Sequence, residues 1–383
     1  MRNHQDLQCM AVPDKYKQLG GFHKYYTGEK LAPLLTIIIG GNHEASNYMW
    51  ELYHGGWLAP NMYYLGAAGC VRVNEIRIAG ASGIFKPTDY SRGYFETLPY
   101  DRSTLRSVYH IREHAFRKLS LLTPRPQVFL SHDWPQKITE HGDLPGLLKR
   151  KGFLADDIRT GKLGSPPLLN LLRTLQPDWW FAAHLHTRFE ARVVHEQPAE
   201  AMNAVKDEAS ISALPTNPDE IALSDLDDEV IAPPRNLPQH STNFLALDKC
   251  GGNRQHLEVV DIPTSAKYDP PRLAYDAEWL AISRAMHPFF SLEQRQRAYP
   301  SETAVRALVA DARSWLADRH DDIEDIEVAK IQRFAMTAPG PGLEDTMGGK
   351  RSQPPWYTNA QTVNFCEFLG IQNLVNAPPP VAE

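Results

Sequence analysis

The stretch LLTIIIGGNHE at residues 34–44 decides the fold of this chain. Its first six residues form a continuous apolar run rich in β-branched side chains, which is typical of a strand buried on both faces. Gly40 and Gly41 end the run, and the loop after them carries Asn42 and His43. We therefore expect a fully buried strand that delivers polar side chains to one edge of a sheet.

Further strand-like runs and two helical patterns follow along the chain. Residues 71–73 and 76–78 alternate about a short turn and predict a hairpin. More strands are expected at residues 127–131, 179–183, 189–194, 244–247 and 256–260. Apolar spacing predicts an amphipathic helix with a basic side over 104–122 and a shorter helix over 168–175, after a Pro-Pro pair. This mixture indicates a layered α/β sandwich.

Composition limits the class of protein. A formal net charge of -6 over 383 residues does not suit a general nucleic-acid coating protein, so RNA would have to be bound by a local basic patch. The four cysteines are widely spaced, which indicates free thiols. No run approaches the roughly 18 apolar residues of a membrane span, so a soluble, intracellular protein is expected. The basic run Lys149-Arg150-Lys151 is too short for a nuclear signal.

The chain divides by composition into a core, an insertion and a C-terminal module. Residues 196–240 are acidic, proline-rich and poor in aromatics, and we expect a disordered insertion there. The flanking stretches, 1–195 and 241–262, are assigned to the α/β core. Residues 263–383 are assigned to a helical module, with a second disordered stretch at about 337–355.

Four candidate metal ligands, Asn42, His132, His184 and His186, each lie directly after a strand-like run. A sheet would bring such residues to one edge, where α/β proteins assemble their sites. Imidazole nitrogens and an amide oxygen are reasonable donors for Zn²⁺, Mn²⁺ or Fe²⁺. A single histidine after a strand is more often a hydrogen-bonded structural residue, so only the conjunction of motifs favours a metal site.

The order of motifs, strand-GGNHE, strand-SHD and strand-AHLH, resembles that of calcineurin-like metallophosphoesterases, with Ala183 in place of the usual glycine. The neighbouring sequence narrows the resemblance. Five segments are similar to the family of RNA lariat debranching enzymes: GGNHEASN at 40–47, GGWLAPNMYYLG at 55–66, SGIFKPTDYSRGYFE at 82–96, SHDWP at 131–135 and FLALDKC at 244–250. The resemblance implies a four-layer metallophosphoesterase sandwich of two mixed β-sheets flanked by helices, with the family's C-terminal domain at 263–383. It also implies hydrolysis of the 2′,5′-phosphodiester at the branch point of excised intron lariats.

The resemblance assigns roles to the motif residues. Asn42, His132 and His184 would bind one metal ion, and His186 would contribute to the other. His43 would protonate the leaving 2′-oxygen, a role that suits an imidazole titrating near neutrality. Alternatively, it would only hold the loop through a hydrogen bond to a carboxylate.

Two acidic neighbours of these motifs remain open. Asp133 would either orient an imidazole or cap its loop. Glu44 is expected to be structural.

Residues 82–116 resemble the family's lariat recognition loop. The residues expected to meet phosphates are Lys86, Arg92, Arg102 and Arg106, and those expected to stack on bases are Phe85, Tyr90, Tyr94 and Phe95. Branched intron RNA is therefore the expected partner, with splicing-associated proteins as further candidates. The family places the chain in the nucleus, with the cytoplasm as a second location.

The sequence also departs from the family. An opening motif with a cysteine or aspartate and a histidine, and a GD motif whose aspartate bridges two metals, are absent, so we expect a sandwich incomplete at the N-terminus. Two divalent ions about 3.7 Å apart repel by roughly 18 kcal/mol at an effective dielectric near 20, and no carboxylate is evident to offset this. The chain as written is expected to hold one Fe²⁺, Zn²⁺ or Mn²⁺ ion at most, where intact members hold two, and to debranch negligibly. The alternatives are another metallophosphoesterase and a truncated, non-catalytic RNA-binding protein.

Overall fold

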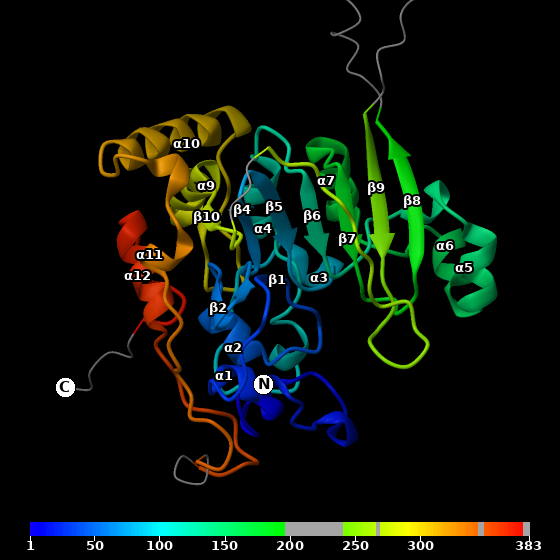
Figure 1. The fold of residues 1–383 in the computed structure, drawn as a ribbon, viewed down its shortest axis with the longest axis horizontal. Helices are drawn as coiled ribbons and strands as arrows, with labels where there is room; N and C mark the ends of the chain where they lie inside the picture. Colours follow the sequence, from blue (N-terminus) through cyan, green and yellow to red (C-terminus); the bar gives the residue numbers. More distant parts are fainter. Residues whose placement is uncertain (196–239, 266–268, 344–347, 378–383) are drawn as a thin grey trace, which may run out of the picture.

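The computed structural model describes residues 1–195, 240–265, 269–343 and 348–377, and the expected insertion at 196–240 lies almost wholly outside them (Figure 1). The described strands form two mixed sheets. The larger sheet has the order β10-β4-β5-β6-β7-β9-β8, and the smaller has the order β1-β3-β2. The strands are β1 (Thr36–Ile38), β2 (Gly56–Ala59), β3 (Met62–Tyr64), β4 (Ala68–Val73), β5 (Ile76–Ala81), β6 (Val128–Ser131), β7 (Trp179–Ala182), β8 (Phe189–Val194), β9 (Ser241–Ala246) and β10 (Leu273–Tyr275).

Strands β5, β6, β7 and β9 are parallel and form the centre of the larger sheet, with antiparallel strands at both edges. The expected hairpin about Asn74 is β4–β5, and Asn74 has a φ of 54°, which suits a tight turn. Four of the five further strands are also present. Residues 256–260 form no strand, and Leu257 and Val259 are exposed.

Helices cover both outer faces of the paired sheets. The helices are α1 (Phe22–Tyr26), α2 (Ser46–Glu51), α3 (Pro87–Tyr90), α4 (Glu113–Ser120), α5 (Leu144–Arg150), α6 (Ala155–Arg159), α7 (Pro166–Leu175), α9 (Ala277–Met286), α10 (Glu302–Ala317), α11 (Val328–Ile331) and α12 (Ala360–Leu369). Short 3₁₀ turns are η1 (Asp6–Cys9), η2 (Asp14–Tyr16), η3 (Thr104–Arg106), η4 (Ile138–His141), η5 (Gly152–Leu154), η6 (His287–Phe289) and η7 (Ile323–Asp325).

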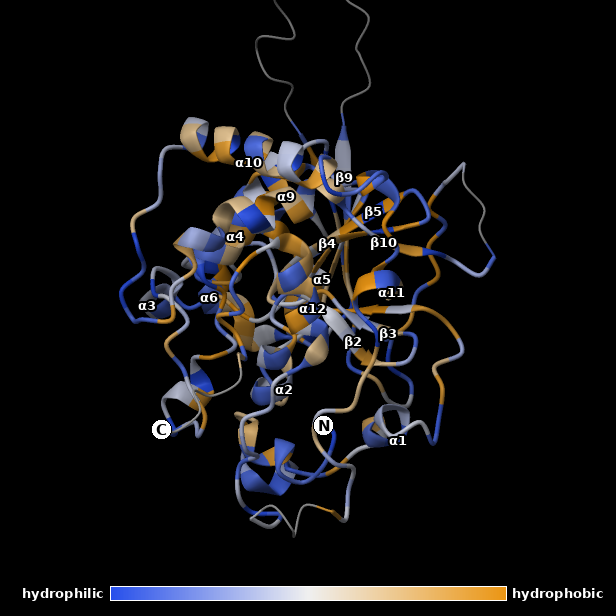
Figure 2. Cartoon of the chain, turned by 90° about the vertical axis from the view of Figure 1, so that its left-hand side faces the viewer, coloured by the Kyte–Doolittle hydropathy of each residue, from blue (hydrophilic) through white to orange (hydrophobic). Residues whose placement is uncertain are grey.

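Alternating side chains on the strands assemble the layers. Phe129 of β6 packs into a cluster with α4 and α7, whereas its neighbour Leu130 faces Ile37 and Leu65 of the smaller sheet. The opposite face of the smaller sheet packs on α1 and α2. The result is a helix, sheet, sheet, helix sandwich, which confirms the expected α/β class. In Figure 2 the strands at its centre are mostly hydrophobic, and α3 and α6 at the surface are mostly hydrophilic.

Strand β1 corrects the prediction of a fully buried strand. Its Thr36 is exposed, Ile37 and Ile38 are only partly buried, and Leu34 before it is 74% exposed. Within the described residues β1 pairs with β3 alone, so its other side is open. A groove of about 850 Å³ lies there, lined by Leu34, Ile37 and Trp57 among others.

The expected helix over 104–122 is also shorter than its apolar spacing suggested. It is divided into η3 and α4, because the residues between them pair with another segment: the N–H of Ile111 donates to the carbonyl of Ile84 at 2.9 Å. The tertiary hydrogen bond replaces the helical one.

The segment assigned to the C-terminal module contains helices α9, α10, α11 and α12, and it also extends the larger sheet, since β10 pairs with β4. Helix α10 packs on α9 at this end of the molecule (Figure 1). The expectation of disorder at 337–355 is not met in its described part. Ala338 is buried, its N–H donates to the hydroxyl of Tyr26, and the Gln353 side chain bonds to the backbone of Tyr100.

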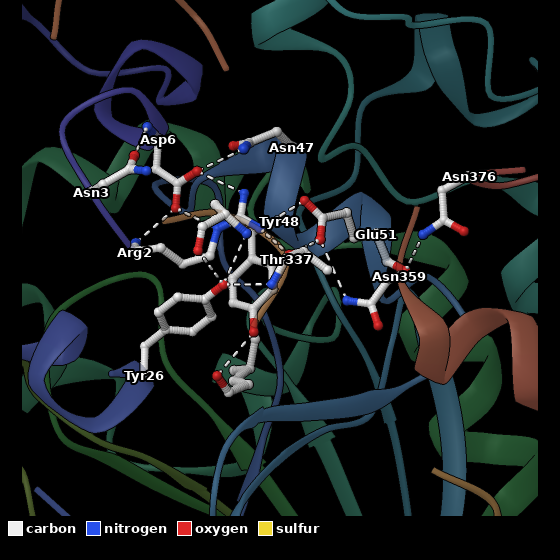
Figure 3. Close-up of polar contacts among 12 residues, drawn as sticks. Arg2, Asn3, Asp6, Tyr26, Asn47, Tyr48, Glu51, Thr337, Asn359 and Asn376 are labelled. Atoms are coloured by element: carbon white, nitrogen blue, oxygen red, sulfur yellow. Dashed lines mark hydrogen bonds and ion pairs between the residues drawn. The ribbon is translucent and has the colours of Figure 1, made fainter. Parts of the chain in front are cut away.

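A buried polar network ties the N-terminal segment to this module (Figure 3). Arg2 is fully buried and pairs with Asp6 at 2.9 Å and with Glu51 at 2.8 Å. Its guanidinium also donates to Thr337 at 2.7 Å and lies over the ring of Tyr48. The single cation lowers the pKa of Asp6, whereas burial raises the pKa of Glu51 despite the same partner.

Candidate metal centre

Three of the four expected ligands meet where their strands end. His132 follows β6, His184 follows the adjacent parallel strand β7, and Asn42 follows β1 of the other sheet. The Nε2 atom of His132 lies 3.0 Å from Oδ1 of Asn42 and 3.2 Å from Nδ1 of His184. The site therefore joins the two sheets at one end of the sandwich.

The second glycine of GGNHE is required by this arrangement. A Cβ atom on Gly41 would lie 2.7 Å from Cε1 and 2.9 Å from Nδ1 of His132. Real side chains essentially never approach so closely. Gly41 thus leaves the space that the imidazole of His132 occupies.

Backbone strain accompanies the HLH motif. His184 and His186 have φ values of 57° and 49°, in the left-handed region that non-glycine residues seldom adopt. Such conformations cost on the order of 1–3 kcal/mol each and concentrate at functional sites. Here the strain turns the chain so that the imidazole of His184 meets that of His132.

Both clustered imidazoles are held neutral. Burial lowers the pKa of His132 to about 3, with further contributions from His184, His43 and His186. Burial likewise lowers the pKa of His184, although Asp133 acts in the opposite direction. Neutral imidazoles keep a lone pair free, which metal binding requires.

The two donor–donor separations about Nε2 of His132 suit ligands of one metal ion. Around an ion bound at about 2.1 Å, neighbouring donors are about 3.0 Å apart in an octahedral arrangement and about 3.4 Å apart in a tetrahedral one. The observed separations of 3.0 and 3.2 Å match this range. The part of the chain that the structure describes contains no cluster of three or more His, Cys, Asp or Glu side chains suited to a metal, so the set depends on the amide of Asn42.

The remaining motif residues lie around this cluster. His43 is exposed, with Nε2 3.4 Å from Nδ2 of Asn42. His186 is exposed and makes no hydrogen bond to the three donors in the described residues. Glu44 accepts the N–H of Gly41 at 3.4 Å, which agrees with a structural role.

Asp133 caps loops, and in the described part of the chain it makes no hydrogen bond to an imidazole. Its carboxylate accepts the N–H of Trp134 at 2.9 Å and that of Phe85 at 3.1 Å. The indole of Trp134 in turn donates to the carbonyl of Ala183, directly before His184. The SHDWP turn therefore holds both histidine loops and the start of the expected recognition loop.

That expected recognition loop is anchored at a second point beside the metal ligands. The N–H of Gly83 donates to the carbonyl of Gly40 at 2.8 Å. Farther along, the buried guanidinium of Arg112 binds Glu96 and the carbonyl of Asp89. Asp89 also accepts a hydrogen bond from His110 at 2.7 Å. These bonds fix the base of the loop and leave its tip at the surface.

Most residues expected to contact RNA are accessible. Lys86, Arg102 and Arg106 are exposed, and Phe85, Tyr90, Arg92 and Phe95 are partly buried. Tyr94 requires a correction. It is only 5% exposed and packs against Tyr53, Trp50 and Phe290, so it belongs to the core and a base cannot stack on it in this conformation.

Sequence reasoning missed several positioning groups. The double glycine was a signal for the close approach of His132 to Gly41. No single-sequence signal indicates the Asp89–His110 pair or the buried Arg112, because both depend on how the loop folds back. The tether from Asp133 to Phe85 also joins segments 48 residues apart.

The fold and this donor cluster define a metallophosphoesterase-like α/β protein. Residues 239–374 match the family model described as "Lariat debranching enzyme, C-terminal domain". The chain is 43% identical over 381 residues to the lariat debranching enzyme of Drosophila melanogaster, covering 97% of this chain and 70% of the relative. It is 38% identical over 425 residues to that of Schizosaccharomyces pombe (100% and 90%) and 41% identical over 307 residues to that of Homo sapiens (80% and 50%). The chain belongs to the lariat debranching enzyme family.

Proposed function

We propose that this protein hydrolyses the 2′,5′-phosphodiester at the branch point of lariat RNA, releasing a linear RNA. The convergence of Asn42, His132 and His184 beside a loop rich in basic and aromatic side chains carries the proposal. Family membership supports it, because the relatives are named for lariat debranching. The reaction class is metal-dependent phosphodiester hydrolysis.

In this proposal Asn42, His132 and His184 hold a divalent metal ion. Such an ion supplies Lewis acidity at a phosphate oxygen. His43 lies beside Asn42 and is exposed, so its imidazole can approach a bound substrate and protonate the leaving 2′-oxygen. His186 would contribute to a second ion, as expected from the sequence.

The segment 82–116 would select the branched substrate. The exposed cations Lys86, Arg102 and Arg106 would meet phosphates, while Phe85, Tyr90 and Phe95 present partly accessible ring faces. Arg92 pairs with Asp89 at 3.1 Å and lies over the ring of Phe95. Its guanidinium would contact a phosphate, and a base would stack on the Arg92–Phe95 pair.

Metal identity and location complete the proposal. Fe²⁺, Zn²⁺ and Mn²⁺ all suit an amide oxygen with two imidazoles. We place the protein in the nucleus, where intron lariats are released, with splicing-associated proteins as further partners. Within the described residues, no helix is long and apolar enough to cross a membrane.

The test compares three substrates under one set of conditions: a synthetic 2′,5′-branched RNA, a linear 3′,5′ RNA of the same composition, and a phosphopeptide. We expect metal-dependent cleavage of the branched RNA alone. Equal cleavage of the linear RNA or the phosphopeptide would favour a phosphoesterase of another specificity.

A second candidate, a non-catalytic RNA-binding protein, is favoured by one observation. Among the described residues, no carboxylate is hydrogen-bonded to the three clustered donors. Metal content decides between the two. Near-stoichiometric metal together with cleavage supports the enzyme, whereas tight branched-RNA binding without either supports the binding protein.

A further inference from the structure

A basic and aromatic surface lies on α5 and η5, separate from the expected recognition loop. We call it the α5 patch and define it by Lys149, Arg150, Lys151, Phe153 and Lys249. All of these side chains are exposed except Lys151, which is partly buried. The sequence showed its basic run, but only the fold shows where that run lies.

The α5 patch is attached to the HLH loop. The guanidinium of Arg150 donates to the hydroxyl of Thr187 at 3.4 Å and to the carbonyl of Arg188 at 3.1 Å, immediately after His186. Lys249 follows the last residues of β9, next to the same loop in the sheet.

Phe153 is 77% exposed although its segment has apolar anchors of its own. Leu147 and Leu154 are buried and fix α5 and η5 to the core. A single exposed apolar residue needs no explanation. Phe153, however, has the ammonium of Lys151 6.0 Å from its ring centroid and follows three consecutive cations in the sequence. An accessible ring beside cations is an arrangement that binds single-stranded nucleic acid.

The charges of this surface are not consumed by ion pairs. Nearby Arg188 and Arg254 are paired with Glu190, Glu258 and Asp248. Within the described residues, the ion pairs include none of the four cations of the α5 patch. The patch is therefore free to attract a polyanion in a protein whose formal net charge is -6.

We infer that the α5 patch is a second RNA-binding surface, on which one arm of the branched substrate lies after leaving the metal centre. Its cations would contact consecutive phosphates, and Phe153 would stack on a base of that arm. The inference rests on the proposed function for the identity of the RNA. In Figure 1, α5 lies beyond β8, at the opposite end of the larger sheet from β10.

The experiment measures binding and not turnover. Fluorescence anisotropy of a labelled branched RNA with arms of about six nucleotides gives the dissociation constant of its complex with the protein. The titrations are made at several salt concentrations, with a chelator present so that the RNA is not hydrolysed. The variants are Lys149→Ala with Lys151→Ala, and Phe153→Ala. The matched control removes two cations from α10, Arg306→Ala with Arg313→Ala, far from α5 (Figure 1).

We expect the lysine variant to weaken binding about tenfold and to reduce the slope of log K against log salt by about 1.4, because each single-strand phosphate contact contributes about 0.7. Phe153→Ala should weaken binding at least about fivefold and leave the slope unchanged, because a stacked base contributes no counterion release. The α10 control should change neither quantity.

Arm length separates this inference from the proposed function. A branched RNA with single-nucleotide arms should bind all variants equally, because it cannot reach the α5 patch. Shortening one arm at a time should identify a single arm whose loss removes the differences. Unchanged binding by the α5 variants, or equal losses on short-armed RNA, would overturn the inference. Absence of cleavage by the wild type would instead bear on the proposed function alone.

Discussion

The carboxylate of Asp133 accepts the N–H of Phe85 at 3.1 Å, so the residue after His132 holds the start of the 82–116 segment. The same carboxylate accepts the N–H of Trp134 at 2.9 Å. Two backbone donors from separate segments thus depend on one buried side chain.

Asp133→Ala should destabilise the protein by about 2–4 kcal/mol, because it removes the acceptor of two N–H groups at a buried position. Asp133→Asn keeps one carbonyl oxygen as an acceptor, so it should lower the free energy of unfolding by about half as much. Urea denaturation gives these values, and hydrogen exchange at the Phe85 amide reports the tether directly. If the Phe85 amide of the alanine variant exchanged as slowly as that of the wild type, Asp133 would not be the group that holds this segment.

Gly41→Ala should displace the imidazole of His132, since the new methyl group would lie 2.7 Å from its Cε1 atom. Because Gly41 sits in a loop, we expect little loss of stability but at least about a tenfold loss of metal affinity, as for a misplaced ligand. Isothermal titration with Zn²⁺ measures it. The control is Gly28→Ala: nothing lies within 4 Å of the added methyl, although its φ of 79° brings a modest backbone cost. Equal metal affinity in both variants would contradict the expectation.

His132→Ala and His184→Ala should each lower metal affinity by more than about 100-fold, since even loss of an outer hydrogen-bond partner of a ligand costs 10–100-fold. The double variant should be little worse than either single one, because both donors serve one ion. Metal analysis by mass spectrometry after dialysis tests this. The control is His23→Ala on α1, a partly buried histidine whose ring bonds to the carbonyl of Gly20. Full metal content in either ligand variant would disprove the assignment.

Lys118→Met should stabilise the protein at neutral pH. Burial lowers the pKa of Lys118 from 10.5 to about 7. Its ammonium lies over the ring of Trp279, and the ion pairs of the described residues include no carboxylate partner for it. As the pH falls from 10.5 to 7, the unfolded chain takes up a proton that the folded protein does not. The wild type therefore loses up to about 4 kcal/mol relative to the methionine variant over this range, and no more below it.

Chemical denaturation of both proteins between pH 7 and 10 measures the Lys118 difference. Lys30→Met, at an exposed position, should show no such pH dependence. A constant difference between wild type and Lys118→Met across this range would mean that the buried amine is charged.

Alanine at Lys86, Arg102 and Arg106 together should weaken branched-RNA binding and reduce its salt slope by about 2, with unchanged hydrolysis of a small chromogenic phosphodiester. Point changes suit this loop better than shortening it, because Tyr94 and Glu96 within it are buried. Equal losses on both substrates would indicate that the loop only supports the fold.

Features that depend on short, local motifs could be predicted from the sequence. Features that depend on contacts between distant segments could not. The meeting of His132 and His184 was predictable, because they follow neighbouring parallel strands whose ends lie at one edge. The approach of Asn42 depends on how the second sheet packs on the first. The exposure of β1 was not predictable, since burial depends on neighbouring strands. Tyr94 has the composition of a stacking residue, but three aromatic neighbours from other segments bury it. Helical spacing over 104–122 could not reveal the bond from Ile111 to Ile84.

The network around Arg2 also constrains how the chain reaches its native state. Arg2 bonds to Thr337, 335 positions away, and the Gln5 side chain bonds to Ser352, 347 positions away. During synthesis, Arg2 must therefore wait until Thr337, 335 positions later, has left the ribosome before all its partners are present. Contacts of such high sequence separation slow folding, because loop closure precedes any gain from the contact. The backbone amides of residues 2–6 should therefore be among the last to become protected from hydrogen exchange during folding. Until then the segment would be accessible to a chaperone.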